Sequence, residues 1–219
     1  NEDGTNVKRE YVTVTRNLSD SLAVAQVGNY TYETLADAIN AAGSGAEVTL
    51  KKDITEDVII PQGADITLNL NTHKITNSSS HTITVNAGAE LTIIGNGTVD
   101  NITHAKGALV NYGTVTLEGG LFERSLEQGI YEPYGNGGNS WYTIANYGEM
   151  PIESGVTVKN SGGYSSMIRN GDETHPTTLT INGGSFDGGI NTVKNDSNGT
   201  LIINNGDFSN TAQYVIMNW

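Results

Sequence analysis

Hydrophobic and polar residues alternate with a period of two along most of this chain. After Gly45 the alternation recurs in short triplets, each with an apolar residue at its first and third positions. We expect these apolar positions to point inward, as in β-strands with one buried face. The triplets occupy residues 48–50, 66–68, 91–93, 115–117, 150–152, 179–181 and 201–203.

The spacing of the triplets indicates a repeating array. Their first residues are separated by 18, 25, 24, 35, 29 and 22 positions, whereas the hairpins of a β-sandwich need a turn about every 8–12 residues. Several triplets are also followed by Gly-Gly-x-Phe or a close variant. We therefore predict an all-β coil of short parallel strands over residues 46–219, with about seven coils and a length of roughly 30–35 Å.

Two further columns of apolar residues and one column of asparagines follow from the same alignment. The second inward column contains Val99, Phe122, Phe186 and Phe208. The third contains Leu109, Ile144, Ile168, Val193 and Ile216. Two residues after each member of the third column comes Asn111, Asn146, Asn170, Asn195 or Asn218. We expect these amides to lie at one bend of every coil and to bond the next coil.

The segment before the array has helical periodicity. Its apolar residues recur at i, i+3, i+4 and i+7, at Leu35, Ala38, Ile39 and Ala42. Thr34 and Asp37 resemble a capping box at its start, and Gly43 stops it. Such a short helix is marginal alone, so we predict that residues 24–45 form a capping helix over the open end of the stack. Residues 1–23 are either strand-like or partly disordered.

Two stretches carry a resemblance to known proteins. Residues 24–42, followed by residues 47–54, resemble the opening of right-handed β-helix surface proteins of gut Firmicutes. The later coils, with their recurrent asparagine, resemble the pectate-lyase-like β-helix superfamily. This resemblance covers roughly residues 24–219 and implies a right-handed parallel β-helix. It implies no single activity, because the superfamily contains lyases, hydrolases, adhesins and proteins of unknown role.

Composition narrows the classes of partner. The 219 residues carry a net charge of -13 with only 11 Lys and Arg, which argues against nucleic acid and against anionic membranes. No apolar run approaches the ~18 residues of a membrane span. Cysteine is absent, so disulfides and thiolate metal sites are excluded. An acidic, cysteine-free chain rich in Thr, Asn and Gly fits an exported bacterial protein at the cell surface.

The last coil stops after Trp219, in the position that Tyr112 and Tyr147 hold in earlier coils. A natural solenoid caps its open end. The chain is therefore either a piece of a longer protein with further domains or one copy of a homo-oligomer joined at this end, and we favour the first.

Two columns of charged residues are candidates for catalysis. Glu118 and Glu153 each directly follow a triplet, which places their backbones ~5 Å apart on adjacent coils. Such carboxylates can pair for acid–base work or hold a cation. Arg169 and Lys194 each precede a recurrent Asn and could meet a uronate, sulfate or sialate. We favour the simpler interpretation that both columns are solvated and have no catalytic role.

The longest coil carries the best candidate for binding. Its insertion contains Tyr131, Tyr134, Trp141 and Tyr142, with Tyr112 and Tyr147 at the neighbouring bend. Long loops on rigid scaffolds often bind ligands, and aromatic faces beside Asn and Glu suit stacking on sugars. The alternative is that these rings only pack the loop onto the coil.

No cofactor or metal is predicted. The four histidines have neither metal spacing nor a shared column, and the acidic turns after Asn195 and Asn204 could hold surface calcium but often occur without it.

Three functions fit these observations. We favour a secreted or surface-displayed β-helix module that binds carbohydrate or host matrix without catalysis. The second is a polysaccharide lyase or glycoside hydrolase that uses Glu118 and Glu153, assisted by Arg169 or Lys194. The third is a structural spacer with no functional patch.

Overall fold

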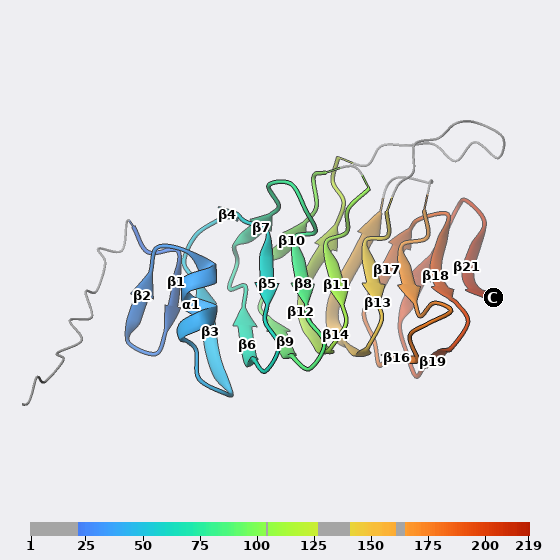
Figure 1. Cartoon of the computed structure of the whole chain (residues 1–219). Helices are drawn as coiled ribbons and strands as arrows, with labels where there is room; N and C mark the ends of the chain where they lie inside the picture. Colours follow the sequence, from blue (N-terminus) through green and yellow to red (C-terminus); the bar gives the residue numbers. More distant parts are fainter. Residues whose placement is uncertain (1–21, 104, 127–140, 161–164) are drawn as a thin grey trace, which may run out of the picture.

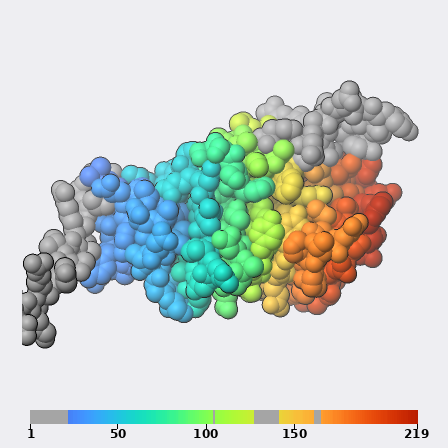
Figure 2. Space-filling model, viewed as in Figure 1, coloured from blue at the N-terminus to red at the C-terminus, as the bar shows by residue number. Residues whose placement is uncertain are grey.

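The computed structural model describes residues 22–103, 105–126, 141–160 and 165–219. They form a parallel β-helix of about six turns with one α-helix at its N-terminal end (Figure 1). The space-filling view shows an elongated body in which segments follow one another along the long axis in sequence order (Figure 2). Each coil therefore packs mainly on the coils before and after it, as expected for a solenoid.

Each turn of the coil has three strands, so the strands stack in three columns. The first column contains β3 (Ala46–Leu50), β6 (Asp65–Asn69), β9 (Glu90–Ile94), the first halves of β12 (Thr114–Glu123) and β14 (Glu149–Asn160), β16 (Thr177–Ile181) and β19 (Gly199–Ile203). The second contains β4 (Ile54–Thr55), β7 (Lys74–Thr76), β10 (Thr98–Asp100), the second halves of β12 and β14, β17 (Ser185–Gly188) and β20 (Asp207–Ser209). The third contains β5 (Val58–Ile60), β8 (Ile83–Val85), β11 (Leu109–Asn111), β13 (Ile144–Asn146), β15 (Ile168–Asn170), β18 (Asn191–Asn195) and β21 (Tyr214–Asn218).

The predicted triplets stack in the first column, except for the first of them. From β6 to β19 the paired residues are those of the sequence alignment. The first triplet is displaced by two residues, because Val48 pairs with Leu68 and not with Ile66. Leu70 is buried and extends the inward-facing pattern of β6. The sequence therefore fits two registers of β3 on β6 equally well, with Val48 beside either Ile66 or Leu68.

The second column is confirmed as a stack of apolar side chains. Val99 pairs with Phe122, and Phe186 with Phe208; the rings of the last pair are stacked with centroids 4.8 Å apart. Val158 lies between Phe122 and Phe186, and the sequence alignment missed it. The core that these columns enclose is continuous from the cap to β18.

The asparagine ladder is also confirmed. Each amide nitrogen donates to the side-chain oxygen of the next ladder residue, at distances of 2.7–2.8 Å from Asn111 to Asn218. The ladder begins at Asn111 because Val85 occupies the corresponding position in the preceding coil. These side chains fix the bend between the third column and the first.

A glycine is required where the chain turns from the first column to the second. Gly184 has φ +102, and a Cβ there would lie 2.8 Å from the carbonyl oxygen of Val156. A left-handed backbone conformation and close backbone contact together favour glycine. This explains the second glycine of the repeated Gly-Gly-x-Phe phrase.

The N-terminal end of the stack is capped by α1 (Leu35–Ala41), and Leu35, Ala38 and Ile39 lie in the core. Thr34 Oγ1 accepts a hydrogen bond from the Asp37 amide at 3.0 Å, as the sequence predicts. The helix ends at Ala41, before Gly43, because Ala42 is already extended with ψ 131.

A hairpin of β1 (Ala25–Val27) and β2 (Tyr30–Tyr32) adds antiparallel pairing to β3, which the sequence analysis did not anticipate. Residues 1–21, most of the predicted N-terminal segment, lie outside the described residues.

Candidate functional site

The candidate site lies on the surface at the bend that follows the asparagine ladder. Residues directly after the ladder asparagines form one outward column, which is Tyr112, Tyr147, Gly171, Asp196 and Trp219. Residues directly before them form a second, which is Val110, Ala145, Arg169, Lys194 and Met217. The repeat therefore places side chains from five coils side by side.

An aromatic–cation patch, defined here as Tyr112, Tyr142, Tyr147, Arg169 and His175, occupies the middle of this surface. Tyr112 and Tyr147 are stacked with ring centroids 5.2 Å apart and an interplanar angle of 20°. The His175 ring lies 5.3 Å from that of Tyr147 and 6.1 Å from that of Tyr112. Tyr112 is 41% exposed and Tyr147 only 8%, so a buried ring supports an accessible one.

The base of the patch is apolar. Tyr147 packs with Val110 and Ala145, and Tyr142 packs against this cluster. Burial raises the pKa of Tyr147, although the nearby Arg169 cation opposes the shift. The Tyr147 hydroxyl is therefore neutral at physiological pH and remains a hydrogen-bonding group.

Arg169 joins the aromatic rings to the charged part of the surface. Its guanidinium carbon lies 5.3 Å from the ring centroid of Tyr142 and 5.7 Å from that of Tyr147. Its Nη1 donates to the Tyr147 hydroxyl at 3.3 Å. Burial lowers the pKa of Arg169, but interactions with Tyr142, Asp196 and Tyr147 outweigh it, and the net shift is upward. Arg169 is therefore a permanent cation held against an aromatic surface.

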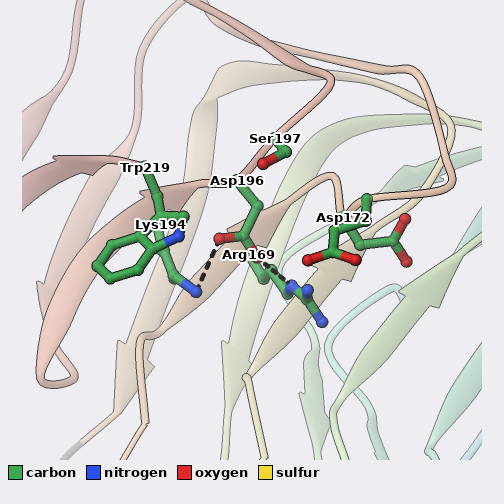
Figure 3. A pocket seen from close by; sticks show the side chains of 7 residues that line it. Arg169, Asp172, Lys194, Asp196, Ser197 and Trp219 are labelled. Atoms are coloured by element: carbon green, nitrogen blue, oxygen red, sulfur yellow. Dashed lines mark hydrogen bonds and ion pairs between the residues drawn. The ribbon is translucent and has the colours of Figure 1, made fainter.

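Asp196 is a residue of this site that the sequence analysis missed, as it missed His175. Its Oδ2 accepts from Arg169 Nε at 2.6 Å, and its Oδ1 lies 2.7 Å from Lys194 Nζ. The Asp196 side chain is only 6% exposed, and Figure 3 shows it between the two cations. A signal was present in the sequence, because Asp196 follows Asn195 as Tyr112 follows Asn111.

A cavity of about 150 Å³ opens beside Asp196, which we call the charged cavity. Its lining residues are Arg169, Asp172, Glu173, Lys194, Asp196, Ser197 and Trp219. Lys194 Nζ lies 5.6 Å from the centroid of the Trp219 ring, which faces the same space (Figure 3). Arg169 belongs to both the patch and the cavity, so the two form one continuous surface.

Asp172 is fixed in the wall of this cavity by local hydrogen bonds. Its Oδ1 accepts from the amides of Thr174 and His175 at 2.7 and 2.8 Å, and it lies 2.8 Å from His175 Nδ1. Burial raises the pKa of Asp172, but these bonds more than offset that effect and hold the pKa well below 3.8. The carboxylate is therefore ionised at physiological pH and orients the His175 ring on the patch.

Of the remaining residues predicted for binding, the structure describes only Trp141. The Trp141 ring lies 5.7 Å from Tyr142 and 5.4 Å from His81, next to the patch. Tyr131 and Tyr134 lie outside the described residues.

The predicted acid pair lies elsewhere on the molecule. Glu118 and Glu153 follow the paired residues Leu117 and Ile152 on adjacent strands of the first column, as the spacing predicts. Glu153 Oε1 accepts from the Asn182 side chain at 2.8 Å. Arg169 and Lys194 belong to a different sheet, so the structure does not bring the four predicted catalytic residues together.

The structure does not test whether the acidic turns hold surface calcium. In the described part of the chain, no group of three or more His, Asp and Glu residues is arranged to hold a metal ion. In the acidic turn after Asn195, the Asp196 carboxylate is engaged by Arg169 and Lys194.

The described residues contain no helix that is both long and apolar enough to cross a membrane.

Comparisons with known proteins do not identify the chain. No protein family, curated protein sequence or solved structure matches it. The resemblance to the pectate-lyase-like superfamily and to surface proteins of gut Firmicutes gains no support from these comparisons, whereas the β-helix itself is shown by the strand pairing. Function therefore has to be inferred from the geometry of the site.

Proposed function

We propose that this chain is a carbohydrate-binding β-helix module that acts without catalysis. The observation that carries the proposal is the exposed ring of Tyr112 stacked on the buried ring of Tyr147. Aromatic rings with one apolar face and nearby polar groups are suited to the amphipathic faces of sugars.

Polar groups that suit sugar hydroxyls lie along the same surface as this ring. The Tyr147 hydroxyl already accepts from Arg169 and still has its own proton to donate. Ser197 lines the adjoining cavity and offers a further donor and acceptor. A sugar stacked on Tyr112 would lie beside Tyr147, and a longer chain would reach Ser197, three coils further along.

The shape of the surface fits an extended ligand. From Tyr112 to Trp219 the outward column crosses four intervals between coils, or about 19 Å at ~4.8 Å per coil. The ladder holds these coils in a fixed register. The protein therefore loses little conformational entropy when a ligand binds. A chain of several sugar units lying along the coil axis is the ligand that suits this arrangement best.

The location of the protein is part of the proposal. The acidic, cysteine-free composition and the resemblance to β-helix surface proteins favour a secreted or surface-displayed bacterial protein with further domains. In that setting the module would hold its protein on a host or microbial glycan.

The test is a glycan array probed with the wild-type chain and with Tyr112→Ala. We expect wild type to bind a subset of glycans and Tyr112→Ala to lose at least about tenfold in affinity, because stacking is worth on the order of 1.4 kcal/mol or more. Tyr30→Ala is the matched control, since Tyr30 is 48% exposed on β2 of the N-terminal cap. Equal losses in both variants, or no loss in Tyr112→Ala, would refute this location for the site.

The two alternatives give different results. A structural spacer would bind no glycan on the array. A lyase or glycoside hydrolase would release unsaturated uronates or reducing ends, and Glu153→Gln would abolish that release. Neither alternative has an observation in its favour comparable to the stacked tyrosines.

A further inference from the structure

We infer that the binding surface is specific for uncharged sugars and that Asp196 sets this specificity by pairing with both Arg169 and Lys194, the two cations among the described residues that line the charged cavity. The inference rests on the proposed carbohydrate-binding function and names the class of its ligand. The sequence analysis weighed the opposite ligand for Arg169 and Lys194, namely a uronate, sulfate or sialate, and favoured no ligand for either residue.

Both cations already form ion pairs with one carboxylate, that of Asp196. Arg169 Nε approaches one oxygen of Asp196 at 2.6 Å, and Lys194 Nζ approaches the other at 2.7 Å. Asp196 itself is nearly buried, and its amide donates to the carbonyl oxygen of Asn170 at 2.9 Å. Asp196 thus occupies the place that an anionic group of a ligand would need, in contacts of the strong charge-assisted kind.

The balance of charge in the cavity also disfavours an anion. Its lining has two cations, Arg169 and Lys194, and three carboxylates, Asp172, Glu173 and Asp196, so the formal sum is 2 − 3 = −1. The low pKa of Asp172 keeps that carboxylate charged. The whole chain, these residues included, has a net charge of -13, which repels polyanionic chains before contact.

The contacts that remain suit neutral hydroxyls. Arg169 has five N–H donors, and Asp196 and the Tyr147 hydroxyl engage two of its nitrogens. Its other donors, the Tyr147 hydroxyl and Ser197 can bond hydroxyl oxygens without requiring a charge. Tyr112, which is stacked on Tyr147, supplies the stacking face.

The experiment compares matched neutral and acidic glycans. The array carries neutral oligosaccharides together with their uronate-, sulfate- and sialate-containing counterparts, including oligogalacturonate before and after methyl esterification. We expect wild type to bind the neutral member of its preferred pair at least about tenfold more tightly. A preference for the acidic members would overturn the inference but leave the proposed function standing, whereas no binding to any glycan would overturn the proposed function.

Two variants identify the residue responsible. Asp196→Asn keeps the shape of the side chain and frees Arg169 and Lys194, so the preference for neutral glycans should fall at least about tenfold. Asp207→Asn makes the same change in net charge at an exposed residue of β20, outside the site, and should leave the preference unchanged. An unchanged preference in a folded Asp196→Asn, or the same change in both variants, would contradict the role of Asp196.

The salt dependence of wild-type binding gives a test that needs no variant. Binding to neutral sugars through stacking and hydrogen bonds should change less than about twofold when salt rises from about 0.05 to 0.5 M, because screening acts mainly on interactions between charges. A loss of tenfold or more over this range would show that charge drives binding and would overturn the inference.

Discussion

Replacing Asn146 with alanine should destabilise the protein far more than replacing an exposed asparagine with alanine does. Asn146 is fully buried at the middle of the ladder. Its Nδ2 donates to Asn170 Oδ1 at 2.8 Å and to the carbonyl oxygen of Thr178 at 3.1 Å. Its Oδ1 accepts from Asn111 at 2.8 Å. The substitution removes these three bonds at once, together with two longer ones to the backbone of Gly148, at 3.2 and 3.3 Å.

The size of the effect follows from which partners are left unpaired. Asn111 keeps a bond to the carbonyl oxygen of Glu149, and Asn170 Oδ1 keeps one from Thr177, so neither loses every partner. The three shorter bonds at about 1 kcal/mol each, with a further penalty for buried groups that stay unpaired, give a loss of about 3–4 kcal/mol in unfolding free energy.

Urea unfolding followed by far-ultraviolet circular dichroism measures this loss. Asn204→Ala is the matched control, because Asn204 makes the same amide–amide bond to Asn182 at 2.8 Å but is exposed; it should cost no more than about 0.5 kcal/mol. The slope of the transition should be checked in each variant, since a repeat array can unfold in stages. If Asn146→Ala costs under about 1 kcal/mol, or no more than the control, the energetic role given to the ladder is wrong.

Two further predictions concern pH and the bend of the coil. Burial raises the pKa of Asp57, but hydrogen bonds from the amides of Ser78, Ser79 and Ser80 and from the Ser78 side chain outweigh it and lower the pKa from 3.8 to about 2. The stability they supply is therefore complete above about pH 4 and is lost as the pH falls towards 2, and Asp57→Asn should flatten a plot of unfolding midpoint against pH in this window. Gly184→Ala should cost at least about 2 kcal/mol in urea unfolding, from the left-handed backbone and the contact with Val156. Gly43→Ala, where a Cβ would have open space, should be near neutral; equal effects of the two alanines, or an unaltered pH profile in Asp57→Asn, would contradict these accounts.

The parts of the fold that could be predicted are those in which several coils repeat the same residue at the same place. The asparagine ladder repeats from Asn111 to Asn218, and the second column repeats phenylalanine at Phe122, Phe186 and Phe208. Val158 escaped prediction because β14 carries an extra residue between Ile152 and Gly155, which shifts the register against β12. Val158 differs from the phenylalanines of its column both in residue type and in spacing from the triplet. With only one of these differences, the position could still have been aligned from the sequence.

The site was only partly predictable for a related reason. Tyr112, Tyr147 and Arg169 follow from the alignment of coils, which names vertical neighbours but not the diagonal contacts between columns. Asp196 meets Arg169 along such a diagonal, since one residue follows a ladder asparagine and the other precedes one. His175 comes from an excursion between coils that has no repeat, so its position beside Tyr147 could be learned only from the structure.

Chemical-shift mapping of the isotope-labelled protein with its best glycan from the array tests the central claim most directly, because it locates the ligand without any substitution. We predict that the largest shifts fall on the backbone amides of Tyr112, Tyr147, Arg169 and Asp196, along one bend of the coil. Shifts centred on Glu118 and Glu153, or spread evenly over the surface, would contradict the placement of the binding site on the aromatic–cation patch.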